Sequence, residues 1–332
     1  MILSKQKFYS FFILFFFVCT NLLGQDAHFS QFYANPLYLN PAFAGTVDYP
    51  RISVNFRDQW PSIPRNFITF SGSYDQHVNA LHGGIGVLVS ADIGGAGIFQ
   101  TYNAGIIYNY RLYATTDFVL QFALQANYLA SSFLLSRLQF ASEILNPNAP
   151  PTLPTDLRNS ITSQFDANFG MVGYTPYLYF GLAVHHLLPT KTKFFTLPGD
   201  KWIPKWTAHA GGKITITEKK KHEVTFGDIF LYPNLIFISQ GNFYYLHEGF
   251  YFKFYPFTIG TWLRHNFKNL EACIVTCGIE YKVFKIGYSY DFNLTKLERT
   301  GGTHEVSLQF FIPYSSNPTK KKKFFPIECP KF

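Results

Sequence analysis

Glycine-rich stretches are the first feature of the chain that could do chemistry. Residues 83–86 and 94–97 hold three glycines each, and such loops cradle phosphate groups in nucleotide-binding proteins. A phosphate loop also needs a following Gly-Lys-Ser or Gly-Lys-Thr and a strand-to-helix context, and neither stretch has these. We therefore interpret the glycines as residues of turns and of close packing.

Histidines and cysteines could bind a metal. His185 and His186 are adjacent, so on a strand their side chains point to opposite faces and cannot share one ion. Cys273 and Cys277 would lie about 13 Å apart on one strand face, beyond the roughly 4.4–6.8 Å between the Cα atoms of a disulfide. No Ser/His/Asp order typical of a hydrolase accompanies them. The sequence thus predicts no enzyme, no metal site and no cofactor.

Composition narrows the class of protein. Charged residues make up only 14% of the chain and aromatic residues 19%, whereas soluble domains carry roughly 25% charged residues. The 38 Phe and 22 Tyr favour strands, and the 24 Gly favour turns. No stretch reaches the roughly 18–20 consecutive apolar residues of a membrane-spanning helix. A membrane protein of this composition would therefore be a closed β-barrel.

Apolar and polar residues alternate repeatedly between about residues 49 and 313. In residues 101–112 the apolar residues fall on one face, and only Ile107 breaks the alternation. Residues 118–128 repeat the pattern, which predicts a hairpin through residues 114–116.

The length of these runs separates two fold classes. Several runs suit the roughly 9–11 residues that a tilted strand needs to cross a bilayer, whereas a soluble secreted β-sandwich would have strands of roughly 5–6 residues. We predict an all-β fold, a transmembrane antiparallel β-barrel of about 14 strands in the bacterial outer membrane. Asp75, Asp166 and Asp291 are expected on its polar inner face.

Three segments depart from the hairpin rhythm. Residues 131–163 include four prolines between Pro147 and Pro154, which predicts a long loop that could hold a short helix near residues 136–144. Residues 187–204 are a second predicted loop. The tail from residue 313 includes Lys320, Lys321, Lys322 and Lys323. A short basic run after the last strand is more typical of a solvated flank than of a nucleic-acid site, so no nucleic-acid partner is expected.

The beginning of the chain has the pattern of a secretory signal peptide. Lys5 and Lys7 precede an apolar run at residues 8–18, and cleavage is expected near Gly24. A lipoprotein interpretation of Cys19 is disfavoured by the bulky residues before it. The predicted organisation is a signal peptide (1–24), a periplasmic N-terminal lead-in (25–49), the barrel (50–312) and the basic tail (313–332).

Two Asn-Pro steps five residues apart mark the lead-in. Each Pro fixes φ and pushes its Asn out of the helical region, and Gly45 permits a tight exit. The segment is therefore expected to be ordered and sharply turned, with Phe29, Phe32, Leu37 and Phe43 as its apolar contacts. It would either dock against the barrel or form a partner-binding surface.

Three segments carry a resemblance to a known family. They are Phe29 to Gly45 with both Asn-Pro steps, the run Ser289, Tyr290, Asp291, Phe292 followed by Thr300, Gly301, Gly302, His304, Glu305, Ser307, Leu308, and the ending Cys329, Pro330, Lys331, Phe332. They resemble the N-terminal signature, the last hairpin and the usual ending of the PorP/SprF family. Members of this family are outer-membrane proteins of the type IX secretion system of gliding and related bacteria. The resemblance covers the whole mature chain.

The resemblance implies a 14-stranded outer-membrane barrel that assists export or cell-surface anchoring of a secreted protein, such as a gliding adhesin, with a type IX C-terminal sorting domain. Its expected partners are outer-membrane lipid, that client protein and the periplasmic secretion and gliding machinery. We hypothesise that the partner-binding residues are Phe29, Ser30, Asn35, Pro36, Asn40, Pro41, Gly45, Lys320, Lys321, Lys322, Lys323, Cys329, Pro330 and Phe332.

A passive porin or a hydrophobic-solute transporter is the alternative function. The predicted inward sets are mostly Ser, Thr, Asn, Gln and Gly with isolated charges, which disfavours an ion-selective channel. A fatty-acid transporter would be expected to carry a substantial N-terminal plug, and residues 25–49 are few for one.

Overall fold

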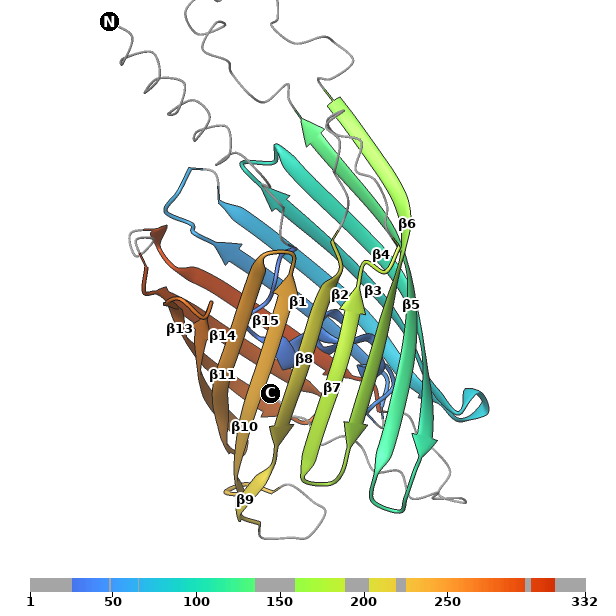
Figure 1. Ribbon diagram of the computed structural model, residues 1–332. Helices are drawn as coiled ribbons and strands as arrows, with labels where there is room; N and C mark the ends of the chain where they lie inside the picture. Colours follow the sequence, from blue (N-terminus) through green and yellow to red (C-terminus); the bar gives the residue numbers. More distant parts are fainter. Residues whose placement is uncertain are drawn as a thin grey trace, which may run out of the picture.

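One antiparallel sheet makes up the body of the protein. The computed structural model describes residues 26–47, 49–64, 66–134, 159–188, 203–218, 225–295 and 300–313. Within these residues the sheet has fifteen strands and closes on itself (Figure 1).

The strands alternate with turns along the whole described chain. They are β1 (Arg51–Gln59), β2 (Phe67–Val78), β3 (Gly83–Gly94), β4 (Phe99–Tyr113), β5 (Val119–Leu134), β6 (Asn159–Tyr174), β7 (Leu178–His185), β8 (Lys205–Gly212), β9 (Ile214–Thr217), β10 (Ile229–Gln240), β11 (Phe243–Phe254), β12 (Phe257–His265), β13 (Leu270–Tyr281), β14 (Phe284–Asn293) and β15 (Thr303–Phe311). The short helices of the described residues are η1 (Phe32–Ala34), α2 (Pro36–Leu39), η2 (Pro41–Phe43) and η3 (Asn79–Leu81).

Pairing between neighbours closes the barrel. Strands adjacent in the chain pair with each other, β15 pairs with β1, and β10 pairs with β11. β8 and β9 are two parts of one wall strand, because both pair with β10 and only Lys213 separates them. With β8 and β9 counted as one, the fifteen strands of the described chain make fourteen. The predicted all-β antiparallel barrel of about 14 strands is confirmed.

Alternation along each strand gives the wall two different faces. In β1, Ile52 and Val54 are exposed on the outside, whereas Ser53 and Asn55 are buried on the inside. The predicted hairpin is also confirmed, because Tyr113 pairs with Val119 across the turn. An apolar outer face with a polar inner face is the pattern of a barrel surrounded by lipid. Near-complete burial of the inner side chains further means that the lumen is filled.

The two ends of the barrel differ in the length of their connections. At the end where β1 begins and β15 ends, the connections are residues 79–82, 114–118, 175–177, 218–228, 255–256 and 282–283; we call it the short-turn end. The opposite end carries residues 135–158 and 186–204, and we call it the long-loop end.

The predicted loop at residues 131–163 is wrong at both of its edges. β5 continues to Leu134, β6 begins at Asn159, and the two strands pair over their full lengths. The prolines that suggested a loop begin only at Pro147, beyond the end of β5 at Leu134, so none of them falls within the paired residues of β5 and β6. The helix predicted near residues 136–144 lies outside the described residues.

None of the helices in the described part of the chain is long and apolar enough to cross a membrane.

The outward apolar face can be tested with one charge at mid-strand. Ile106 points outward from the middle of β4 and Tyr113 ends the same strand. We expect Ile106→Arg to destabilise the folded barrel by about 2–4 kcal/mol, and Tyr113→Arg by only about 0–1 kcal/mol near the interface. Denaturant titration in lipid, followed by heat-modifiable migration, measures both. Equal effects at the two positions would contradict a lipid-facing middle.

Candidate functional site

The lumen is occupied by the chain's own N-terminal segment. Residues 26–47, which we call the plug, lie inside the barrel, where Figure 1 shows their short helices in dark blue behind the front strands. Phe29, Phe32, Leu37 and Phe43 are all at most 4% exposed. The prediction of an ordered, turned segment with these four apolar contacts is confirmed. The expectation that the segment is too short to plug a barrel is wrong, because it folds into three compact turns within the lumen.

Apolar residues on the inner wall pack around the plug. Leu37 and Phe43 share one buried cluster with wall residues Ile107, Val172 and Ile236. The ring of Phe32 lies 5.4 Å from that of Trp262, centroid to centroid. Ile107, the one break in the alternation of its strand, is therefore an apolar contact of the plug.

The two Asn-Pro steps set the turns of the plug. Pro36 begins α2 and Pro41 begins η2, because proline suits the first position of a helix, where its missing N–H is not needed. The Asn40 side chain caps η2 by accepting from Ala42 N at 2.9 Å. Its Nδ2 donates to the carbonyl oxygens of Met171 and Leu182, each at 3.1 Å. Asn40 thus lies at the end of α2 and the start of η2, and its side chain bonds to both β6 and β7.

Glycines in the wall provide space for the plug. A Cβ added at Gly84 would lie 2.2 Å from Ala44 O, and one at Gly170 would lie 2.2 Å from Asn40 Oδ1. Neither position can hold a larger residue without moving the plug. The interpretation of residues 83–86 as close-packing glycines is confirmed at Gly84.

A buried ionic group, the Arg57 cluster, holds Ser30 and Gln31 in the first third of the plug. It consists of Arg57, Arg264, Asp291 and Glu305, from β1, β12, β14 and β15. Arg57 Nη1 lies 3.2 Å from Glu305 Oε2, and Arg264 Nη1 lies 3.2 Å from Asp291 Oδ2.

Ser30 and Gln31 complete this cluster from the plug side. The Glu305 carboxylate accepts from Ser30 N at 2.7 Å and from Gln31 N at 2.9 Å. Ser30 Oγ donates to Asp291 Oδ2 at 2.7 Å, and Gln31 Nε2 donates to Glu305 O at 2.9 Å. Because charge-assisted bonds to buried carboxylates are strong, these contacts fix the plug to the wall.

A second group of contacts holds the plug at the short-turn end. Arg51 and Asp75 form a bidentate pair, with Arg51 Nε 2.9 Å from Asp75 Oδ1. Asp75 Oδ2 also accepts from Gly45 N at 2.8 Å, and Arg111 Nη2 donates to Gly45 O at 2.6 Å. Gly45 has φ of +67° and closely approaches Gly84, so the backbone geometry here favours glycine.

A third group of contacts holds the plug at the long-loop end. Asp26 lies 2.9 Å from His186 Nε2 and 3.0 Å from Lys205 Nζ. His186 Nδ1 lies 2.7 Å from Asp166 Oδ2. Burial alone would lower the pKa of His186, but the carboxylates of Asp26 and Asp166 raise it to about 9. Burial would raise the pKa of Asp26, yet His186 and Lys205 hold that pKa well below its usual value.

The predicted geometry of the two histidines is wrong. His186 follows the end of β7 with φ of +61°, so the chain leaves the strand conformation there. Both imidazoles are buried and line one cavity beside Asp26. Within the described residues, no group of three or more His, Cys, Asp or Glu side chains could hold a metal ion.

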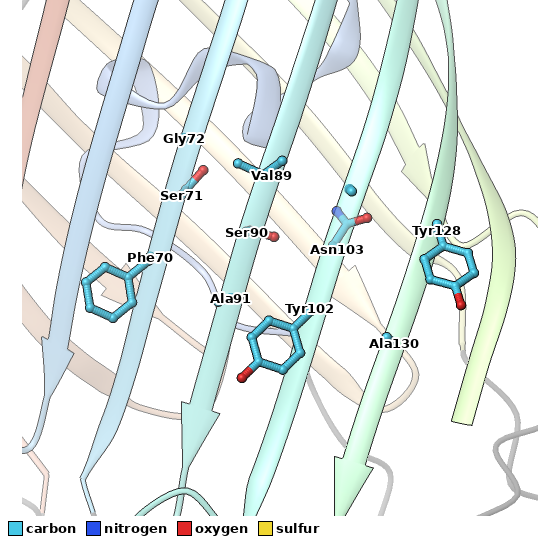
Figure 2. A pocket seen from close by; sticks show the side chains of 11 residues that line it. Phe70, Ser71, Gly72, Val89, Ser90, Ala91, Tyr102, Asn103, Tyr128 and Ala130 are labelled. Carbon is cyan, nitrogen blue, oxygen red and sulfur yellow. The ribbon is translucent and has the colours of Figure 1, made fainter. Parts of the chain in front are cut away.

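Little space remains between the plug and the wall. Among the described residues, three cavities beside the plug have volumes of about 100, 30 and 20 Å³. A larger groove of about 420 Å³ lies on β2 to β5. Figure 2 shows the rings of Phe70, Tyr102 and Tyr128 beside the small residues Gly72 and Ala130. Since these three rings are largely exposed on the outer face, the groove can accept apolar chains but offers no catalytic groups.

The sequence-predicted site residues fall into two sets. Phe29, Ser30, Asn35, Pro36, Asn40, Pro41 and Gly45 come together in the plug and contact the wall. Lys320, Lys321, Lys322, Lys323, Cys329, Pro330 and Phe332 lie outside the described residues. The role of both sets in binding a partner stays a prediction. Sequence reasoning missed the wall residues that hold the plug, above all Arg57, Arg264 and Glu305, although isolated inward charges in the strands were a signal for them.

The fold and its occupied lumen define a class of protein. A closed antiparallel barrel with an apolar outside and a polar inside is the architecture of an outer-membrane protein, and here it is closed by a plug. The family model described as type IX secretion system membrane protein PorP/SprF matches residues 21–310. The chain belongs to this family, which confirms the predicted family and the outer-membrane location. Membership of a family of secretion-system membrane proteins also confirms that the chain is not an enzyme.

Solved structures share the fold at low sequence identity. The toluene transporter TbuX of Ralstonia pickettii is 9% identical, with 83% of this chain and 93% of that chain covered and a TM-score of 0.51. The P. putida toluene transporter TodX is 11% identical over 83% and 93% of the two chains, with a TM-score of 0.46. A Pseudomonas aeruginosa FadL homologue is 10% identical over 82% and 91%, with a TM-score of 0.44. The comparison with curated proteins finds no match.

Location in the outer membrane orients the barrel. Outer-membrane barrels place short turns in the periplasm and longer loops outside. The short-turn end is therefore periplasmic and the long-loop end extracellular. Asp26 accordingly lies near the extracellular end, and the plug runs from there to the periplasmic end at Gly45.

Gly170 and Gly72 provide a matched test of how closely the plug packs against the wall. A Cβ at Gly170 would meet Asn40 and Pro41 at 2.2 and 2.9 Å, whereas a Cβ at Gly72 would meet its nearest atom at 3.5 Å. We expect Gly170→Ala to lower the free energy of unfolding by about 1–3 kcal/mol through overpacking. Gly72→Ala should leave it within about 0.5 kcal/mol. Denaturant titration measures both, and faster hydrogen exchange in residues 35–45 of Gly170→Ala alone would locate the effect. Equal stability of the two variants would contradict the close packing of the plug against Gly170.

The histidine at the extracellular end gives a pH dependence of defined sign. Because the pKa of His186 is raised from 6.5 to about 9, its stabilising contribution is fully present below pH 6.5 and is lost as the pH rises through 9. We expect the melting temperature of His186→Gln to be lower than that of the original protein. This difference should be largest at pH 6 and should vanish near pH 10. A difference that stays constant over this range would contradict the assigned ion pairs.

Proposed function

We propose that this barrel assists the export or cell-surface anchoring of a secreted protein with a C-terminal sorting domain, and that it does so without conducting solutes through its lumen. Membership of the type IX secretion family already associates the chain with secretion machinery. The observation that carries the rest of the proposal is the plug.

A passive porin needs a continuous aqueous path through its lumen. Here the plug is bonded to the wall near both ends, at Asp26 and at Gly45, and through the Arg57 cluster between them. The cavities left beside it are small. A filled barrel can still act through its outer wall, its loops and its periplasmic turns, and these surfaces suit a scaffold or anchor.

The chain leaves the barrel on the side of the periplasmic machinery. β15 ends at Phe311, at the short-turn end, and the described chain continues to Pro313. This supports a periplasmic position for the basic tail, which we propose docks on a partner there through its lysines.

A hydrophobic-solute transporter is the second candidate, because the fold is shared with a toluene transporter. The ionic and polar contacts around the plug do not favour it. A path for an apolar solute would have to pass Arg57, Asp291 and Glu305, which are buried and polar, with Asp291 and Glu305 both paired with Arg57.

Deletion of the gene tests the proposal. We expect the deletion strain to lose at least one large surface protein that carries a C-terminal sorting domain, and to take up small solutes at the original rate. Comparison of surface and medium proteomes with the parent strain measures the loss and names the client. An unchanged surface proteome with altered uptake of an apolar solute would overturn the proposal in favour of a transporter.

Removal of residues 314–332 tests the tail separately. Normal client export by that variant would contradict a docking role for the tail while leaving the role of the barrel intact.

A further inference from the structure

Among the described residues, β6 has a neighbouring strand on only one side over about half its length. β5 pairs with β6 from Asn159 to Tyr174, whereas β7 pairs only with Phe169–Tyr174. The last bond on the β7 side joins Leu187 N to Ala167 O at 2.9 Å. Beyond that bond, the described chain offers no strand beside residues 159–166. We call this stretch the β6 edge.

The alternating direction of backbone groups along a strand identifies which groups of the β6 edge face away from β5; we call the space on that side the gap. In an antiparallel ladder, consecutive residues direct their N–H and C=O groups to opposite neighbours. Ala167 O points to the β7 side, so Ile161, Ser163 and Phe165 direct their backbone groups to the same side. Within the described residues, these groups have no strand to bond there.

The side chains at the edge are also uncovered. Ile161 and Phe165 are 74% and 73% exposed, above both the 45% of Leu308 and the 67% of Ile106 on wall strands paired on both sides. On the inner face, the amide of Gln164 is buried and neither its Oε1 nor its Nε2 has a hydrogen-bond partner. An added strand would cover the first two side chains and bring polar groups beside the third.

The edge lacks several of the features that protect strand edges, although the inward-pointing charge of Asp166 is one of them. Lysine, proline and bulges usually prevent pairing with another chain. Residues 159–168 contain neither lysine nor proline, and the pairing of β6 with β5 is regular throughout.

The edge lies at the extracellular end. β6 has 16 residues and is about 53 Å long at 3.3 Å per residue, whereas a strand tilted by about 45° crosses the hydrocarbon core in 9–11 residues. Figure 1 shows the green outer ends of β5 and β6 extending beyond the end of β7. The β6 edge is therefore presented where a secreted protein arrives.

We propose that the β6 edge binds an extended segment of the secreted client as an added antiparallel strand, bonded to the backbone of Ile161, Ser163 and Phe165. This inference rests on the proposed function and names the surface that performs it. Main-chain bonds would give the affinity, and pockets beside Ile161 and Phe165 would select apolar side chains at alternate positions of the segment.

Two other occupants fit the edge less well. Lipid chains cannot bond the backbone groups. A second copy in the same membrane would bring its β6 alongside in the parallel direction, because a two-fold axis along the membrane normal preserves strand direction. Parallel pairing is slightly less stable per residue.

A photo-cross-linking residue in place of Phe165 tests the occupant in living cells. We expect it to cross-link to the surface protein that is lost from the deletion strain. The same residue in place of Leu308, which is outward but flanked by two paired strands, should not. A cross-link only within the same chain, only to a second copy, or none would overturn the inference.

Proline at Ser163 tests the pairing itself. Ser163→Pro removes an N–H that faces the gap and leaves the ladder to β5 intact. Ser163→Ala removes the same hydroxyl and keeps the N–H. We expect surface-bound client to fall about tenfold in Ser163→Pro and to stay unchanged in Ser163→Ala, with both barrels folded by heat-modifiable migration.

The outcomes of these experiments distinguish a failure of the inference about the β6 edge from a failure of the proposed function. If gene deletion removes the client from the cell surface but the Ser163→Pro variant retains it there, the inference that the client binds the β6 edge is wrong. The proposed function then stands. If gene deletion leaves the client in place, both are wrong. If Ser163→Pro fails to fold, the cross-link at Phe165 decides alone.

Discussion

Two buried carboxylates, on Asp291 and Glu305, are the constraint on which the rest of the structure depends. Both are fully buried in the barrel, where an unpaired charge would be strongly destabilising. Arg57 and Arg264 supply part of what they need, and the Ser30 and Gln31 N–H groups and the Ser30 hydroxyl of the plug supply more, while Asp291 Oδ1 has no hydrogen-bond partner among the described residues. Barrel and plug therefore share one set of buried polar bonds, beside the apolar cluster that packs Leu37 and Phe43 against the wall. The glycines that let the plug approach the wall, and the Asn-Pro turns that shape it, serve this same set of bonds.

A lumen filled in this way shifts function to the surfaces of the barrel. The ends of the plug are bonded at Asp26 and Gly45, so the segment spans most of the barrel's height, and the cavity beside Asp26 has a volume of only about 100 Å³. A member of a secretion-system family with this architecture has its outer wall, its long extracellular loops and its periplasmic turns available for partners. The β6 edge, which has no partner strand on its second side among the described residues, is the part of that surface where the chemistry of a partner can be stated, because backbone groups bond only other polar groups at strand spacing.

Much of this fold could be predicted from the sequence, because side-chain alternation reports directly which face of a strand meets lipid. The barrel, the hairpin at residues 114–116 and the order of the N-terminal segment follow from such local patterns. The plug could not be located in the same way. Ile107 was visible as a break in the pattern of its strand, but an inward apolar residue does not say what lies opposite. The contact of Ser30 with Glu305 joins positions 275 residues apart, and no local spacing encodes it. Likewise, the prolines from Pro147 to Pro154 suggested a loop but could not show that β5 extends to Leu134 and that β6 begins at Asn159.

Ionic conductance of the purified protein in a planar bilayer tests most directly whether the plug closes the lumen. We expect the intact chain to show no ionic conductance, and a chain lacking residues 27–44 to conduct ions steadily through the emptied barrel. Arg57→Met, which removes the cation that pairs with the buried Glu305, should give intermittent openings. A steady conductance in the intact chain, equal to that of the deletion variant, would contradict the account.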